Sequence, residues 1–353
     1  MLKILWFGHR DIKHPKAGGA ERTIYEVSKR LVKVGYNVTL ATVNPGSLRE
    51  SDGIEGIKVV RVKGNIRAHL YAPLIIKKVK PDIVIDDLAH AVPWLSPYFT
   101  DKPVIAFFRH LHARSLGGQV NVVEAEVLKL IERQYSKIYG KSFFVTESET
   151  SINDLVSLGI KKERIFRIVP GINHDLFKLK KKTDEPSLIY FGGMRNYKRP
   201  WLSLELLKKM GEVQLNVAGS GPSYEKAAQK CKELDLYNRV NFTGRLSDDD
   251  LAEVLGSSWI NLHFSQTEGF GLSIVEAAAC GTPTVALDTP GVSEVINEFG
   301  FGLVARNLND MKNKVEEIIK DYDIWSRKVY ENSLRFSWDK TAEDWDGLLK
   351  SLA

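Results

Sequence analysis

Short apolar segments alternate with longer amphipathic stretches along this chain, a pattern typical of parallel α/β proteins. In the first half it predicts strands over 2–8, 37–42, 57–62, 82–86, 103–108 and 142–146. Helices are predicted between them over 19–34, 67–79 and 121–139. In the second half it predicts strands over 187–192, 213–218, 240–243, 259–264 and 284–287, again with helices between. The fold class expected is therefore α/β, in two separate halves.

The two halves are separated by a polar, lysine-rich segment over 178–186 without apolar periodicity, which predicts a linker. The domains would then cover 1–177 and 187–335, and 353 residues are enough for two cores. Three further helices are predicted over 307–320, 323–333 and 339–352, with no strand after them. The aromatic and leucine residues of the final segment, 336–353, predict that it packs back onto another surface.

Composition places the chain among ordinary globular proteins, with 43% hydrophobic and 27% charged residues. No apolar run reaches the roughly 18 residues of a membrane span. The opening segment 1–7 is predicted to be a strand rather than a signal sequence, so a cytoplasmic location is expected. Cys231 and Cys280 provide neither a disulfide framework nor a metal cluster and are expected to be buried thiols.

The net charge of +6 is unevenly distributed, with lysines gathered over 77–80 and 178–182. Such runs are commonly solvated surface. The alternative is peripheral contact with an anionic membrane, here the inner membrane surface, or with a phosphate-bearing acceptor. Because no basic stripe with interleaved aromatic residues occurs, nucleic acid is not an expected partner.

The most informative segment follows the strand predicted over 259–264. Glu268 precedes the glycines Gly269 and Gly271, and an apolar helical pattern begins at Leu272 and contains Glu276. Two glycines permit a sharp turn, and the first turn of a helix leaves unpaired N–H groups that bind anions. This segment would offer backbone amides to a diphosphate and a carboxylate on either side to hydroxyl groups. A nucleotide-sugar has that layout. The alternative is an ordinary turn followed by a solvated helix carboxylate.

The sequence from Glu268 to Ala286 closely resembles the signature of retaining glycosyltransferases of family 4, the glycosyl transferases group 1. The resemblance extends over nearly the whole chain. It implies two Rossmann-like domains facing each other across a cleft (the B-type, or GT-B, fold), with the terminal helix crossing back to the first. By the same resemblance, Glu268 contacts the donor sugar and Glu276 the nucleotide ribose. The amides of Gly269, Phe270, Gly271 and Leu272 would lie on the donor diphosphate.

Two other segments resemble the diphosphate-binding parts of this family. Gly19, at the start of the first long helix, matches the glycine beside the donor diphosphate and the acceptor. Lys198 matches the family lysine, but Gly193 stands where the family has an arginine. Arg195, two positions later, is the candidate replacement, and the alternative is that Arg195 is a solvated surface residue.

The family usually has a histidine directly after the strand predicted here over 103–108, close to the donor sugar. Arg109 occupies that slot without a gap and His110 follows it, so His110 is the candidate, with the register open by one residue. The alternative is a histidine packed for structure. Gly244 and Arg245 resemble the family segment that lines the nucleotide base.

No metal site or cofactor is expected beyond the nucleotide-sugar co-substrate. The acidic run 248–250 follows Ser247 and is predicted to begin a helix, with Ser247 as its cap and the acids at the positive end of the dipole. The resemblance therefore predicts a metal-independent retaining hexosyltransferase that acts on a glycan or lipid-linked glycan acceptor. Nucleotide-sugar 2-epimerases share the two-Rossmann layout, so an isomerase of that kind is the alternative. A nicotinamide oxidoreductase is disfavoured because no Gly-x-Gly-x-x-Gly follows the first strand.

Overall fold

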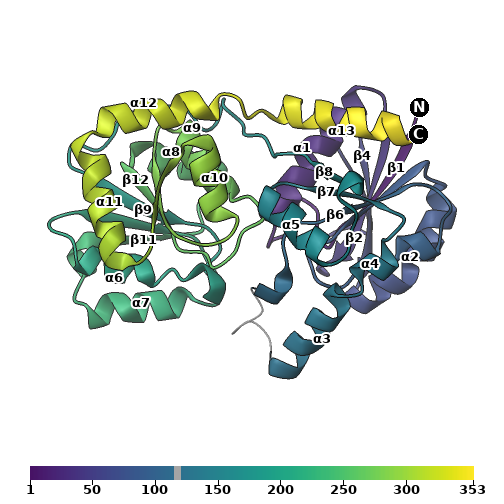
Figure 1. Cartoon of the computed structure of the whole chain (residues 1–353), viewed down its shortest axis with the longest axis horizontal. Coiled ribbons are helices and arrows are strands. Elements are labelled where there is room, and N and C mark those ends of the chain that lie inside the picture. Colours follow the sequence, from purple (N-terminus) through teal and green to yellow (C-terminus); the bar gives the residue numbers. More distant parts are fainter. Residues whose placement is uncertain (115–120) are drawn as a thin grey trace. The chain divides into compact units, whose positions relative to one another are not determined.

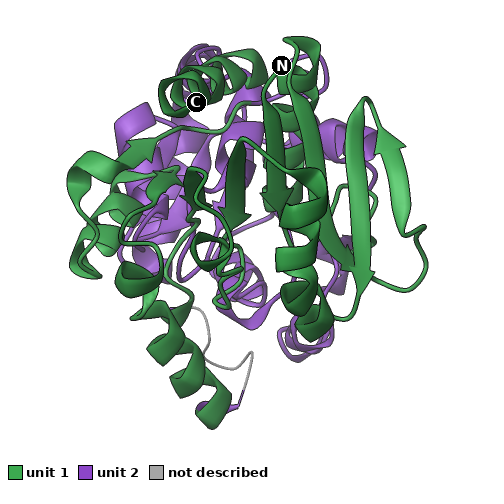
Figure 2. Ribbon diagram, turned by 90° about the vertical axis from the view of Figure 1, so that its right-hand side faces the viewer, with its two compact units in different colours: residues 1–113, 123–171, 338–353 green, residues 114–122, 172–337 purple. Residues whose placement is uncertain are grey.

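The computed structural model describes residues 1–114 and 121–353. The chain forms two compact units (Figure 2). Unit 1 contains 1–113, 123–171 and 338–353, and unit 2 contains 172–337 with the described residues of 114–122. The predicted linker 178–186 therefore lies inside unit 2. Most residues of this segment are exposed, but Lys182 anchors it: its Nζ donates to the carbonyl oxygens of Ser258 and Cys280 and to Thr282 Oγ1 at 2.7–3.1 Å.

Unit 1 is built on an eight-stranded sheet in the order β3-β4-β2-β1-β5-β6-β7-β8, parallel except for the β3–β4 pair. Its strands are β1 Lys3–Phe7, β2 Asn37–Asn44, β3 Ser51–Ile54, β4 Ile57–Lys63, β5 Ile83–Asp87, β6 Val104–Phe107, β7 Phe143–Thr146 and β8 Ile165–Arg167. Strands β3 and β8 were not predicted, because β3 is short and polar and β8 has only three residues.

The helices of unit 1 are α1 Gly19–Lys33, α2 Asn65–Val79, α3 Val122–Glu132, α4 Tyr135–Ile138, α5 Glu149–Ser157 and α13 Trp338–Leu352 (Figure 1). Three short 3₁₀ helices complete it: η1 Ser96–Tyr98, η2 His112–Arg114 and η3 Lys162–Arg164. The single helix predicted over 121–139 is wrong, since α3 and α4 are separate helices. The prediction that the final segment packs back is confirmed: the Trp345 ring lies 5.1 Å from Trp6 and 5.3 Å from Phe107.

Unit 2 has a six-stranded, wholly parallel sheet in the order β11-β10-β9-β12-β13-β14. Its strands are β9 Ser187–Phe191, β10 Gln214–Ala218, β11 Val240–Gly244, β12 Ile260–His263, β13 Thr284–Leu287 and β14 Gly302–Ala305. Strand β14 was not predicted. It approaches β13 so closely that a Cβ at Gly302 would lie 1.8 Å from the Thr284 carbonyl oxygen, which requires glycine.

The helices of unit 2 are α6 Leu202–Lys208, α7 Tyr224–Glu233, α8 Asp248–Ser257, α9 Leu272–Ala279, α10 Val292–Phe299, α11 Leu308–Lys320 and α12 Tyr322–Ser333. The 3₁₀ helices are η4 Asn196–Lys198 and η5 Tyr237–Arg239. Cys231 and Cys280 are buried and unpaired, as expected. Within the described residues, no helix is both long enough and apolar enough to cross a membrane.

Candidate functional site

An ion pair joins two predicted site residues at the carboxyl ends of neighbouring strands in unit 2. Lys198 lies in η4, after β9, and Glu268 lies in the loop after β12. Lys198 Nζ is 2.6 Å from Glu268 Oε1, and the two side chains are only 21% and 14% exposed. Two further contacts hold these loops together: Gln266 N donates to the Tyr197 carbonyl and Arg199 Nε to the Phe264 carbonyl. Ligands of open α/β sheets bind at this end of the strands.

Two donors bind the same oxygen of Glu268, and a histidine lies nearby. Besides Lys198, Ser265 Oγ donates to Oε1 at 2.7 Å and His263 Nε2 lies 3.6 Å from it. Burial acts to raise the pKa of Glu268, but the charge of Lys198, followed by that of His263 and the hydrogen bonds, outweighs it and holds the pKa at about 2. Glu268 is therefore a fixed carboxylate. The hydrogen bonds and ion pairs found for this side chain among residues 1–114 and 121–353 all involve Oε1.

His263 was not recognised in the sequence as part of the site. It is the last residue of β12, is 7% exposed at its side chain, and burial lowers its pKa to about 4. The imidazole is therefore neutral near pH 7. A histidine at the end of an otherwise apolar strand was the available signal, and its partner Glu268 lies only five positions further on.

The glycine turn places backbone amides next to Glu268. Gly271 is the N-cap of α9 and has a left-handed conformation, with φ 84° and ψ 58°. A Cβ at Gly291 would lie 2.3 Å from the Glu268 carbonyl oxygen, so the loop before α10 packs directly on this backbone. Phe270 is buried against the rings of Phe299 and Phe336, at 5.9 and 6.1 Å. The Phe270 side chain is thus part of the core. Glu276, on α9, is half-buried.

The loop after β9 contains Arg195, the candidate replacement for the family arginine. Arg195 is exposed, and its N–H donates to the Gly193 carbonyl at 2.9 Å. Its Nε lies 4.0 Å from the position of a Cβ at Gly193. The Arg195 side chain therefore passes within contact distance of the position where a side chain at 193 would begin. Gly244, at the end of β11, is half-buried and Arg245 is exposed.

In unit 1, Arg109 is part of a buried ionic cluster. Its Nε is 3.0 Å from Asp87 Oδ1 and its Nη1 is 2.7 Å from Glu147 Oε1, while the guanidinium lies 3.6 Å from the Phe107 ring centroid. Nη2 donates to the Ala20 carbonyl at 3.3 Å and so ties the cluster to the first turn of α1, next to Gly19. Arg109 is thus committed to protein contacts. His110, the next residue, is half-buried, with its ring 4.9 Å from that of His112.

The structure also brings together a group of histidines near the carboxyl ends of β1 and β5, which was not predicted from the sequence. The His9 ring lies 4.0 Å from His90 and 5.5 Å from His69, and His69 stacks on Trp94 at 4.3 Å. Burial, followed by the neighbouring histidines, lowers the pKa of His9 well below its usual value. Six of the eight histidines precede residue 113, which was the available signal.

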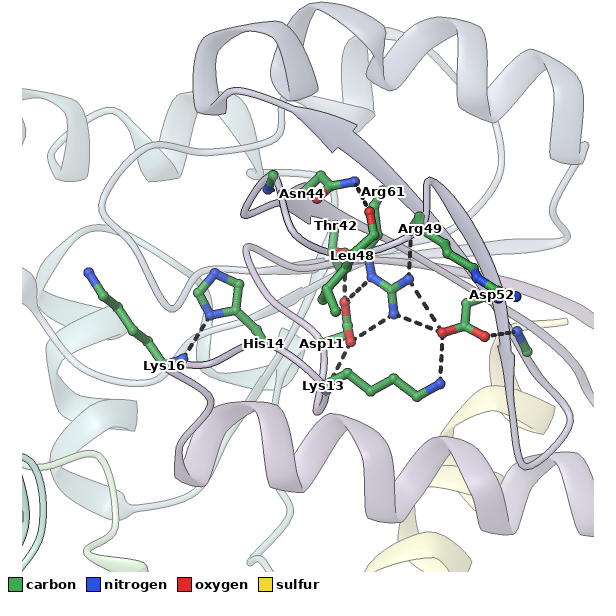
Figure 3. Close-up of polar contacts among 12 residues, drawn as sticks. Asp11, Lys13, His14, Lys16, Thr42, Asn44, Leu48, Arg49, Asp52 and Arg61 are labelled. Carbon is green, nitrogen blue, oxygen red and sulfur yellow. Dashed lines mark hydrogen bonds and ion pairs between the residues drawn. The ribbon is translucent and has the colours of Figure 1, made fainter. Parts of the chain in front are cut away.

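The loop between β1 and α1 is fixed by a buried ion pair, shown in Figure 3. Arg61 of β4 binds Asp11 through both its Nε and its Nη2, at 2.6 and 3.0 Å. Asp52 of β3 accepts from Lys13 at 2.8 Å. This network holds the loop that leads to Gly18 and Gly19. At Gly18, the backbone N–H donates to Glu21 Oε2 at 2.8 Å.

The described residues contain no group of three or more His, Cys, Asp or Glu side chains arranged to hold a metal ion. The acidic run 248–250 begins α8, and Ser247 caps that helix by accepting from Asp250 N at 3.1 Å. The prediction of a helix start is confirmed.

Comparison with known proteins identifies both halves of the chain. A family model described as Glycosyl transferases group 1 matches residues 172–336, and one described as Glycosyltransferase Family 4 matches 17–176. A component of the phosphatidylinositol N-acetylglucosaminyltransferase of Arabidopsis thaliana is 22% identical over 94% of this chain and 78% of that protein.

Solved structures show the same fold. Sucrose-phosphate synthase from Thermosynechococcus elongatus has a TM-score of 0.84 at 19% identity, covering 100% of this chain and 99% of that one. Anabaena Alr3699/HepE, in complex with UDP-glucose, has a TM-score of 0.78 at 18% identity, covering 100% of both chains. The predicted architecture of two Rossmann-like domains is confirmed.

Proposed function

The chain belongs to the glycosyl transferases group 1, and from that premise we propose that it transfers a hexose from a nucleoside-diphosphate sugar to a glycan or lipid-linked glycan acceptor. The Lys198–Glu268 pair beside the glycine turn carries this proposal. It combines a cation and helix amides, which suit a diphosphate, with a fixed carboxylate oxygen, which suits sugar hydroxyls. A solved structure of similar fold contains UDP-glucose, which supports a donor of this class. The similarities are to glycosyltransferases, and the 2-epimerase alternative receives no support.

In the proposed reaction, the bond between the anomeric carbon and the diphosphate oxygen breaks as the acceptor oxygen attacks. Lys198, Arg195 and the amides of 269–272 stabilise the negative charge that develops on the leaving diphosphate. Because these groups supply the positive charge, the reaction needs no divalent metal. The acceptor hydroxyl proton passes to a leaving phosphate oxygen. Attack on the face that the diphosphate leaves gives retention of configuration, which rests on the family resemblance.

The remaining site residues are assigned to binding. Glu268 holds hydroxyls of the donor sugar, Glu276 the ribose, and Gly244 with Arg245 the base. His110 and Gly19, in unit 1, are assigned to the donor sugar and the diphosphate. The name of the Arabidopsis relative includes phosphatidylinositol, which supports a lipid-linked acceptor.

The test is a panel of nucleoside diphosphates and nucleotide-sugars screened by thermal shift, followed by transfer assays with the donor that binds. A ligand at about 100 times its Kd stabilises the native state by about 2.7 kcal/mol, which is readily measured. Transfer should persist in EDTA, and NMR of the first-formed product should show the donor's anomeric configuration. An inverted product would refute retention, and a rate restored only by added divalent metal would refute metal independence.

A further inference from the structure

Helix α2, in unit 1, carries an exposed aliphatic stripe. Ile66, Leu70 and Leu74 are 80%, 72% and 59% exposed. They are spaced four residues apart and therefore lie along one face of the helix. The opposite face is occupied, since Ala68 and Ala72 are buried in the core beneath the helix. Isolated surface leucines are ordinary, but three in a row on one helix face indicate an interaction surface.

The same helix is strongly basic. Residues 65–80 contain no Asp or Glu, and Arg67, Lys77, Lys78 and Lys80 lie on it or at its end. Arg67 lies over the ring of Tyr71, 5.1 Å from its centroid, and Nη2 donates to the tyrosine hydroxyl at 3.2 Å. An apolar stripe flanked by lysine, arginine and tyrosine is the composition of helices that lie in a membrane interface.

We propose that the outer face of α2 docks on an anionic bilayer surface, with Ile66, Leu70 and Leu74 entering the headgroup region and the basic residues binding lipid phosphates. The positive charge of α2 distinguishes between the candidate partners of this face. A second copy of this face would place like charges against one another, whereas an anionic membrane complements them. Nucleic acid is disfavoured as a partner, because its phosphate backbone offers no apolar surface to the aliphatic stripe.

The docked helix would lie next to the carboxyl ends of the unit 1 strands. His69, on α2, stacks on Trp94 and lies 5.5 Å from His9, which follows β1. An acceptor whose headgroup protrudes from the bilayer would therefore reach this edge of the sheet. The inference rests on the proposed action on a lipid-linked acceptor and deepens it. The docking itself is measured without donor or acceptor, so it can fail while the proposed transfer stands.

The experiment is co-sedimentation of the full chain with vesicles of two compositions. One is phosphatidylcholine alone, and the other contains about one-third phosphatidylglycerol as the anionic lipid. We expect binding to the anionic vesicles only, weakened by salt. Each basic residue at the surface contributes about a fivefold change in partitioning, so Lys77→Gln with Lys78→Gln should weaken binding roughly 25-fold. Leu70→Glu with Leu74→Glu should abolish it.

Matched substitutions in unit 2 provide controls. Ile324, on α12, is 70% exposed, and the Lys181 side chain is 89% exposed. Ile324→Glu and Lys181→Gln should leave vesicle binding unchanged. Equal binding of the wild type and the Leu70→Glu/Leu74→Glu variant, or loss of binding only in the controls, would overturn the assignment. Concentration-dependent dimerisation that is abolished by Leu70→Glu, without vesicle binding, would show that α2 docks a second copy instead.

Discussion

Lys198 Nζ lies 2.6 Å from Glu268 Oε1, although 70 positions separate the two residues in the sequence. The pair forms because β9 and β12 are neighbours in the sheet and both loops leave its carboxyl edge. In this structure the lysine charge is balanced by the carboxylate, which also holds the ammonium in one place. A cation held before the donor arrives needs no reorganisation when charge develops on the leaving diphosphate.

Lys198→Ala is expected to lower kcat by a factor of about 10²–10³, the usual effect of removing one preorganised transition-state donor. The measurement is kcat at saturating donor and fixed ionic strength. Lys208→Ala, at the end of α6, is the control and should be near wild type. A Lys198→Ala variant with normal kcat and a raised KM would assign this lysine to ground-state binding alone.

Substitutions of Glu268 and of Glu276 are expected to change different kinetic parameters. Glu268→Gln keeps the size of the side chain but removes the charge, and it should lower kcat because the residue faces the reacting sugar. Glu276→Ala should mainly raise KM and weaken binding of the bare nucleoside diphosphate, since ribose contacts are alike in ground and transition states. Calorimetry with the nucleoside diphosphate checks this division, which fails if both variants weaken that binding equally.

The neutral state of His263 predicts a loss of stability in mild acid. Its pKa is lowered to about 4 in the folded protein from 6.5 when unfolded, so the unfolded state takes up the proton first as pH falls. The stabilisation is present above about pH 6.5 and is lost as pH falls towards 4, by about 3 kcal/mol in total. His263→Gln should flatten the dependence of the free energy of unfolding over this window. Parallel wild-type and variant curves from about pH 8 to 4 would show that the imidazole titrates freely.

The cluster around Arg109 predicts a structural role for this residue. Arg109→Ala leaves Asp87 and Glu147 as buried carboxylates without their cation, and it should cost about 3–5 kcal/mol of unfolding free energy. The exposed Arg306–Asp310 pair is the control, because Arg306→Ala should cost less than about 1 kcal/mol. Denaturant unfolding measures both. A native-like Arg109→Ala would show that the carboxylates find other partners.

The local part of the site was predictable and the assembled part was not. Glu268, the glycine turn and Glu276 are contiguous, so strand, turn and helix signals in one short stretch define their arrangement. The Lys198–Glu268 contact and the Arg109 cluster depend on which strands are neighbours, since Asp87, Arg109 and Glu147 each belong to or follow a different strand. Periodicity does not give strand order. The same limit applies to the contacts of Lys182, which binds carbonyl groups of residues 258 and 280, far along the chain.

The last prediction concerns the substitution at Gly193. Arg195 Nε lies 4.0 Å from the Cβ position of residue 193, so the two positions share the same part of the loop. If Arg195 serves the leaving diphosphate, Arg195→Ala should lower kcat by a factor of about 10²–10³. Gly193 does not have a positive φ, so an arginine is tolerated there without backbone strain.

The double variant Gly193→Arg/Arg195→Ala should therefore recover much of the lost kcat, because it returns a guanidinium to the same loop. Gly193→Leu/Arg195→Ala is the matched control and should recover none. Rescue by arginine alone separates the charge from the bulk of the side chain. If Arg195→Ala retains wild-type kcat, the exposed arginine is only a surface charge, worth at most about 1 kcal/mol. Lys198 and the amides of 269–272 would then form the diphosphate site without it.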